Sequence, residues 1–195
     1  MGTEASDAQP AAWLVLAVGD ERQHGGNDGY DDEPAEYYSW DSTVPNAAAL
    51  SVGDVIALWD KHTLLGVSII ENIDLGTAKK FRYSCPMCGR ASLKARKTKT
   101  PTYKCFKCGG VFDEPVARLD DVTTYRSRHD GAWVEMSGAM SAGEVRELCE
   151  SPASQLSLRP LRWEAFKSAA EASSRGKAFK GLERHRLMLQ AGLRP

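Results

Sequence analysis

Two pairs of cysteines constrain this chain more than any other feature of its sequence. Cys85 and Cys88 enclose Pro-Met, Cys105 and Cys108 enclose Phe-Lys, and sixteen residues separate the pairs. Two residues between cysteines let both thiolates of a tight turn face the same ion, and four thiolates form a closed structural zinc site. The sequence therefore predicts a zinc ribbon that holds one Zn²⁺. Two disulfides, or spacing by chance, are the alternative interpretation.

The residues around these cysteines agree with a metal site. Gly89 and Gly109 each follow the second cysteine of a pair, where such a turn usually needs a positive φ. Cys149 lies in an apolar helical pattern and is expected to be a buried small hydrophobe. With four of five cysteines assigned to a metal, the composition indicates a reducing, cytoplasmic environment.

Charge is distributed unevenly along the chain. Ten Lys or Arg residues and no acid lie between Lys79 and Lys107, whereas the first thirty-six residues hold nine acids and only Arg22. A rigid basic ribbon that also carries Tyr103 and Phe106 suits a phosphate backbone, although a merely solvated surface is the alternative. The candidate phosphate contacts are Lys94, Arg96, Lys97 and Lys99 in the ribbon, and Arg126 and Arg128 after a later strand, where a solvated turn is equally consistent.

The hydrophobic pattern predicts a mainly β, α+β fold of about five to seven strands. We expect residues 12–78 and 112–172 to form one β domain finished by short helices, with the ribbon inserted at 79–111. Residues 1–11 are predicted to be a disordered leader and residues 173–195 a basic linker or weak helix. The longest apolar run has strand length, well below the roughly 20 residues of a membrane span, so no membrane contact is expected.

One segment resembles a known family. Tyr38-x-Trp-x-Ser-Thr-x-x-Asn46, followed by Gly53-Asp54, a strand and Leu65-Gly66-Val67, is similar to the EVE and YTH branch of the PUA superfamily. The resemblance covers roughly residues 12–75 and implies a PUA-like β-barrel that binds a nucleic acid carrying a modified base. It also implies that Trp40 is one wall of an aromatic cage for an extruded base, with Ser42 and Asn46 hydrogen-bonding that base.

The chemistry of an extruded base agrees with this resemblance. An aromatic wall restores about 1–3 kcal/mol of lost stacking, and the Asp41 carboxylate can accept a hydrogen bond from an exocyclic amine, as carboxylates do with cytosine. Core packing is the alternative for every aromatic, and it is favoured for Trp13, Trp59 and Trp133, which aliphatic residues flank. The predicted base pocket comprises Tyr37, Tyr38, Trp40, Asp41, Ser42, Asn46 and Trp59, and the candidates for its second wall are Tyr37, Tyr38, Trp59, Tyr125 and Trp133.

No catalytic residues are predicted for this chain. A zinc ion held by four thiolates has no open position for water, the four histidines are scattered, and no nucleophile motif is present. By analogy with bacterial proteins that join an EVE-like domain to an HNH nuclease, we expect the specificity domain of a modification-dependent restriction endonuclease, with cleavage in a further C-terminal HNH domain. The expected partner is double-stranded DNA with a flipped 5-substituted cytosine, and N6-methyladenine second. A barrel for modified RNA and a zinc-ribbon protein-interaction module are the alternatives.

Overall fold

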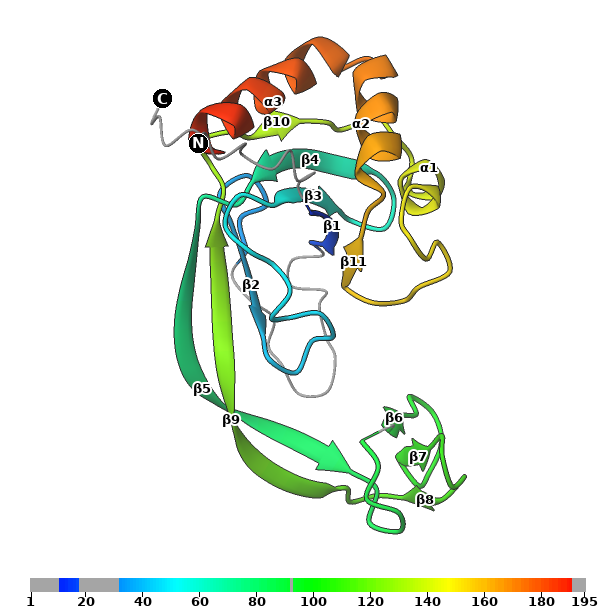
Figure 1. Cartoon of the computed structure of the whole chain (residues 1–195). Coiled ribbons are helices and arrows are strands. Elements are labelled where there is room, and N and C mark those ends of the chain that lie inside the picture. The colour runs from blue at the N-terminus through cyan, green and yellow to red at the C-terminus, as the bar shows by residue number, and fades with distance from the viewer. Residues whose placement is uncertain (1–10, 18–31, 92, 191–195) are drawn as a thin grey trace, which may run out of the picture.

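The structure, a computed structural model, describes residues 11–17, 32–91 and 93–190. Figure 1 shows a body capped by helices at one end and a long two-stranded arm at the other, with a small ribbon at the tip of the arm. The described residues are mainly β, as the sequence predicts, and their strands form three sheets. None of the helices among these residues has both the length and the apolarity needed to cross a membrane.

The centre of the body is a five-stranded sheet in the order β10-β4-β3-β1-β11. Strands β1 (Ala12–Leu16) and β3 (Val55–Trp59) run parallel to each other, and β3 forms an antiparallel pair with β4 (Leu64–Ile69). The short strands β10 (Val134–Glu135) and β11 (Leu158–Pro160) complete the two edges. Strands β1 and β3 are apolar at every position because both faces of this sheet are buried.

Helices cover one face of the central sheet. Helix α1 (Ala142–Glu147) begins at a capping box of Ser141 and Glu144, in which the Glu144 carboxylate accepts from the Ser141 N–H at 2.8 Å. Helices α2 (Trp163–Ala172) and α3 (Gly176–Gln190) follow. Their aromatic side chains pack on Leu14, Trp59 and Val67 of the sheet, and the buried members are Trp163, Phe166 and Phe179.

A three-stranded sheet covers the other face and continues as the arm. Its order is β2-β9-β5, where β2 spans Tyr37–Asp41, β5 spans Asn72–Ser84 and β9 spans Val116–Arg128. Near the body, Tyr38 and Trp40 of β2 pack against Val15 and Ile56 of the central sheet. Beyond β2, strands β5 and β9 continue as an antiparallel pair without a break in register until Ser84 faces Val116. The arm therefore places whatever lies at its tip well away from the body (Figure 1).

Residues at the tip form the third sheet, in the order β6-β7-β8. These strands are β6 (Leu93–Ala95), β7 (Tyr103–Cys105) and β8 (Val111–Phe112). The stacked rings of Tyr103 and Phe112, with centroids 6.2 Å apart, link β7 to β8. The predicted insertion at 79–111 lies inside the longer segment formed by the arm and this ribbon.

Several motif residues have packing roles. Gly53 adopts φ of 92°, which favours glycine, and Asp54 accepts hydrogen bonds from the Trp13 indole and the Ser51 N–H, each at 2.9 Å. Burial raises the pKa of Asp54, against the effect of these bonds. A side chain at Gly66 would collide with the ring of Trp133. The Gly-Asp and Leu-Gly-Val signals are thus explained by how β1, β3, β4 and the residues after β9 pack together.

The predicted barrel is wrong. The described residues form no closed barrel, because the two larger sheets pack face to face and each keeps its own edge strands. Residues 173–195, expected to be a linker or weak helix, contain helix α3, and Phe179 and Leu182 anchor this helix in the core. Most of the predicted leader at 1–11 lies outside the described residues.

Candidate metal centre and nucleic-acid interface

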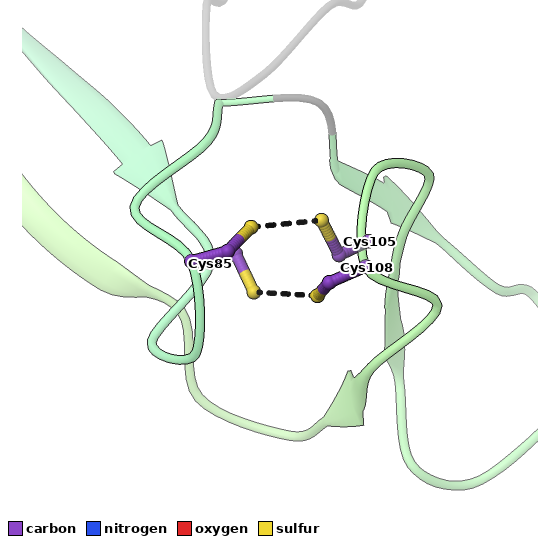
Figure 2. A group of neighbouring side chains, drawn as sticks. Cys85, Cys105 and Cys108 are labelled. Atoms are coloured by element: carbon purple, nitrogen blue, oxygen red, sulfur yellow. Dashed lines mark hydrogen bonds between the residues drawn. The ribbon is translucent and has the colours of Figure 1, made fainter.

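The four paired cysteines meet at the tip of the arm. Their sulfur atoms all lie within 4.8 Å of one another, and Figure 2 shows the two pairs of sulfurs facing each other across the ribbon. The Cys85 and Cys108 sulfurs are 3.7 Å apart, as are those of Cys88 and Cys105. Four ligands about 2.3 Å from a central zinc ion have sulfur–sulfur edges of about 3.8 Å. The cluster therefore has the donor set and the spacing of a tetrahedral metal site, and no pair is close enough for a disulfide bond.

Two similar turns supply these ligands. The Gly89 N–H donates to the Cys85 carbonyl at 2.8 Å, and the Gly109 N–H donates to the Cys105 carbonyl at 3.0 Å. Gly89 has φ of 71° and Gly109 has φ of 74°, which confirms the expected positive values. Backbone N–H groups of Cys108 and Lys107 lower the pKa of the Cys105 thiol to about 6, against the effect of burial. The Gly110 N–H acts to lower the pKa of the Cys108 thiol, but burial and the other cysteine sulfurs raise this pKa to about 11, so Cys105 rather than Cys108 is favoured as a thiolate at neutral pH.

The cations of the ribbon surround this cluster. Exposed positive side chains are contributed by both turns, by β7 and by the loop between β6 and β7, namely Arg90, Lys97, Lys99, Lys104 and Lys107. Of the predicted phosphate contacts, Lys97 and Lys99 belong to this group, and Lys94 lies on β6 opposite Lys104. Arg96 is half-buried, and its guanidinium donates to the Pro101 carbonyl, so it holds the loop between β6 and β7.

Arg126 and Arg128 lie elsewhere, on the body end of β9. By strand alternation they occupy the sheet face opposite Trp40 and Tyr125. The Arg126 guanidinium lies 3.8 Å from the centre of the Tyr37 ring, and the Arg128 Nε atom lies 3.4 Å from an Asp130 carboxylate oxygen. The structure therefore separates these arginines from the cations of the ribbon.

Trp40 is not the open wall of a pocket. Its side chain is completely buried, its indole N–H donates to the Ala47 carbonyl at 2.9 Å, and its ring lies between those of Tyr38 and Tyr125. The prediction that Trp40 faces a ligand is wrong, because strand alternation directs Tyr38 and Trp40 into the core between the two sheets. Tyr38 is also completely buried.

A hollow nevertheless lies directly beside Trp40. It has a volume of about 460 Å³ and is lined by Ser42, Val44, Asn46, Tyr125 and residues 47–49. This volume is within the roughly 300–1,000 Å³ range of small-ligand sites. The Tyr125 ring is half-buried and is stacked on Trp40 at 5.3 Å with an angle of 6° between the planes. Two of the predicted pocket residues, Ser42 and Asn46, therefore belong to this hollow, and Tyr125 takes the aromatic position.

The other predicted pocket residues have different roles. The Asp41 carboxylate is buried and accepts hydrogen bonds from Lys80 Nζ at 2.7 Å and from the Thr43 N–H at 2.8 Å, so it is not directed at a ligand. Trp59 belongs to the core beneath the helices and contacts the Arg159 guanidinium at 4.9 Å. Tyr37 lies on the outer face of the sheet with Arg126.

Sequence reasoning missed the alanines that line the hollow and treated Tyr125 only as one of several candidates. The signal for Tyr125 is the register of β2 with β9, which places it opposite Trp40, and a single sequence does not show this pairing. The resemblance implies that Asn46 hydrogen-bonds the base, yet its Nδ2 donates to the Leu158 carbonyl at 3.0 Å and its backbone has φ of 68°. Asn46 thus also shapes the loop that forms the hollow.

Comparisons of this chain with protein-family models, with curated proteins and with solved structures find no match. The fold and the site therefore define only a class, a mainly β protein with a four-cysteine centre at the tip of a two-stranded arm.

Proposed function

We propose that this protein is a nucleic-acid recognition module whose ribbon binds the phosphate backbone of double-stranded DNA. The observation that carries the proposal is the cationic ribbon at the tip of the arm, which continues an acid-free stretch of sequence from Lys79 to Lys107. Lys and Arg that neutralise phosphates release counterions, so such a surface gains affinity for DNA at low salt. The exposed lysines Lys97, Lys99, Lys104 and Lys107 are the main contacts.

Zn²⁺ is the metal proposed for the four-cysteine centre. Cys85, Cys88, Cys105 and Cys108 would hold it, and four thiolates with no further ligand position suit a structural ion. When bound, the metal would fix the two turns relative to each other. The protein's own lysines would then present their charges in a constant arrangement, which favours binding because less conformational freedom is lost.

The hollow beside Trp40 is the proposed site for an unstacked, modified base. Tyr125 offers an aromatic surface supported from behind by Trp40, and Ser42 and Asn46 supply polar groups at the same hollow. Stacking on such a ring is worth about 1–3 kcal/mol per base. A 5-substituted cytosine remains the first candidate ligand and N6-methyladenine the second, both from the resemblance to EVE and YTH domains. The same resemblance supports a role as the specificity part of a modification-dependent restriction endonuclease.

Fluorescence anisotropy tests the ribbon and the hollow separately. In the ribbon variant, Lys97, Lys99, Lys104 and Lys107 are changed to Gln. The matched control changes four exposed basic residues at and before α3 to Gln, namely Arg175, Lys177, Lys180 and Arg184. The ribbon variant is expected to lose affinity for all DNA sequences alike and to reduce the salt slope by about 3–4, at roughly 0.9 for each lost phosphate contact. An unchanged salt slope contradicts the proposed role of the ribbon.

The second arm of the experiment compares duplexes that differ at a single cytosine substituent. Wild-type protein is expected to distinguish them, and Tyr125→Ala is expected to lose the distinction while keeping its salt-sensitive binding. RNA bound as tightly as DNA favours the modified-RNA alternative. Absence of any salt-dependent binding to either nucleic acid favours a protein-interaction module.

A further inference from the structure

Exposed apolar side chains lie along the arm where the body does not cover it. Phe81 of β5 is 54% exposed and Leu119 of β9 is 48% exposed, and these two residues face each other directly across the strand pair. Leu75, which faces Tyr125, is 70% exposed. A two-stranded arm in water does not need large apolar side chains at such positions, so this pattern indicates a contact surface.

These residues share one face of the arm with the hollow. In each strand, successive side chains point to opposite faces of the sheet. The directly opposed pairs are separated by even numbers of residues and therefore lie on the same face, namely Leu75–Tyr125, Lys79–Asp121 and Phe81–Leu119. Tyr125 lines the hollow, so Phe81 and Leu119 lie on the continuation of the face that packs on the body. Figure 1 shows the arm curving between the body and the ribbon at its tip.

The length of the arm relates the hollow to the ribbon. Six residues separate Leu75 from Phe81, or about 20 Å along an antiparallel strand, and nine separate Leu75 from Ser84, or about 31 Å. At 3.4 Å per base pair, these lengths along the strand set upper limits of about six and about nine base pairs, because the arm curves and Lys80 reaches Asp41 and Thr43 beside the hollow. An elongated ligand is therefore needed to contact the hollow, the apolar pair and the cationic ribbon together.

We propose that the face of the arm that carries Phe81 and Leu119 is a docking surface for a nucleic-acid duplex, with these two residues as an apolar contact in its groove. This inference rests on the proposed function and adds the middle of the binding site. Charge complementarity selects the ligand, because the strand pair that carries these residues leads directly into the ribbon with its exposed lysines. Phe and Leu are among the side chains that insert at base steps, and such contacts are made without hydrogen-bond readout. The apolar pair therefore adds affinity irrespective of sequence.

The test is a series of duplexes carrying one modified cytosine near one end and a flank that increases from about four to about fourteen base pairs. Wild-type protein is expected to gain affinity in two steps, the first at a flank of no more than about six base pairs and the second at a longer flank of no more than about nine. The double variant Phe81→Ser with Leu119→Ser is expected to lose the first step, about a tenfold change, and to keep the second. The ribbon variant is expected to show the reverse.

Val116→Ser is the matched control. Val116 is 51% exposed on the same strand as Leu119, but strand alternation places it on the opposite face of the arm. The control is expected to match wild type at every flank length. Circular dichroism and bound metal, measured for each variant, establish that the arm and ribbon remain folded.

Two outcomes overturn the inference while leaving the proposed function intact. In the first, the double variant and Val116→Ser bind every duplex as wild type does. In the second, sedimentation shows that wild-type protein self-associates without DNA and that the double variant does not, so the apolar pair serves a second copy of the chain. Failure of the wild-type protein to bind any duplex instead removes the proposed function itself.

Discussion

Lys80 joins the base of the arm to the loop of the hollow through Asp41. Its ammonium nitrogen lies 2.7 Å from Asp41 Oδ2 and 3.1 Å from Thr43 Oγ1. The Asp41 and Lys80 side chains are only 2% and 17% exposed. Between these residues, Ser42 exchanges two hydrogen bonds with the backbone of Thr123, at 2.8 and 3.1 Å. The segment that starts the hollow is thus held by both strands of the arm, which makes Lys80 a positioning residue.

Loss of this ion pair is expected to destabilise the protein. Lys80→Met removes the Lys80 ammonium from the buried Asp41 carboxylate, so the free energy of unfolding should fall by about 3 kcal/mol. The neighbouring pair Lys79–Asp121 has a nitrogen–oxygen distance of 2.8 Å but is 65% and 76% exposed. Lys79→Met should therefore cost less than about 1 kcal/mol. Urea unfolding of the two variants measures the difference, and equal losses would show that Asp41 does not depend on Lys80.

Metal removal is expected to affect the ribbon alone. Because the body has its own cores beneath the helices and between the two sheets, it should keep its thermal transition when a chelator removes the metal. Residues 85–115 should become sensitive to proteolysis, and Cys105→Ser should act in the same way. Mass spectrometry of the fragments measures where cleavage begins. Cleavage first within the body would contradict this division of stability.

Trp40 and Tyr125 should respond differently to truncation. Trp40→Ala removes a completely buried ring and should lower the free energy of unfolding by about 3–5 kcal/mol. Tyr125→Ala removes a half-buried ring and should cost less, while it abolishes discrimination between modified and unmodified duplexes. Thermal denaturation and anisotropy on the same samples separate the two effects. A Trp40→Phe variant that keeps discrimination would support the role of Trp40 as a backing residue.

His129 should make the protein sensitive to mild acid. Burial lowers the pKa of this imidazole, whose Nε2–H donates to the Pro34 carbonyl at 3.0 Å. Below its ordinary pKa of about 6.5, the unfolded chain takes up a proton that the folded chain resists. The contribution of neutral His129 to the free energy of unfolding is therefore fully present above about pH 6.5. It is lost as the pH falls toward the lowered pKa of His129 in the folded state.

Urea unfolding at about pH 7.5, 6.5 and 5.5 measures this loss. His129→Gln should reduce the change in the free energy of unfolding between these pH values. His62→Gln, at an exposed position, should leave that change as it is in the wild type. An unaltered pH dependence in His129→Gln would mean that other groups control acid sensitivity.

The success of the sequence prediction depended on how local each signal is. The cysteine centre follows from spacing within two turns, and β1 and β3 follow from short apolar runs because a doubly covered strand is apolar throughout. The arm has no such signature. Residues 79–84 are exposed or only half-buried, so charged and apolar residues alternate there without a buried face that would mark a strand.

Trp40 shows why the pocket was harder to predict. Its sequence neighbours Ser39 and Asp41 are polar, which favoured an open site, but alternation places them on the opposite face from Tyr38 and Trp40. Asp41 is buried by Lys80, which is distant in sequence, and no local pattern contains that contact. The hollow itself depends on the pairing of β2 with β9 and therefore on tertiary structure.

The register of the arm ends with Ser84 directly opposite Val116, so the chain leaves for the ribbon and returns from it at neighbouring points. Opposed residues of an antiparallel pair have Cα atoms about 4.5–5.5 Å apart, a gap that a two-residue hairpin turn can bridge. The metal-binding unit is thus a cassette with a single attachment point. It can be exchanged, shortened or deleted, in evolution or by protein engineering, without changing how the remaining strands and helices are connected.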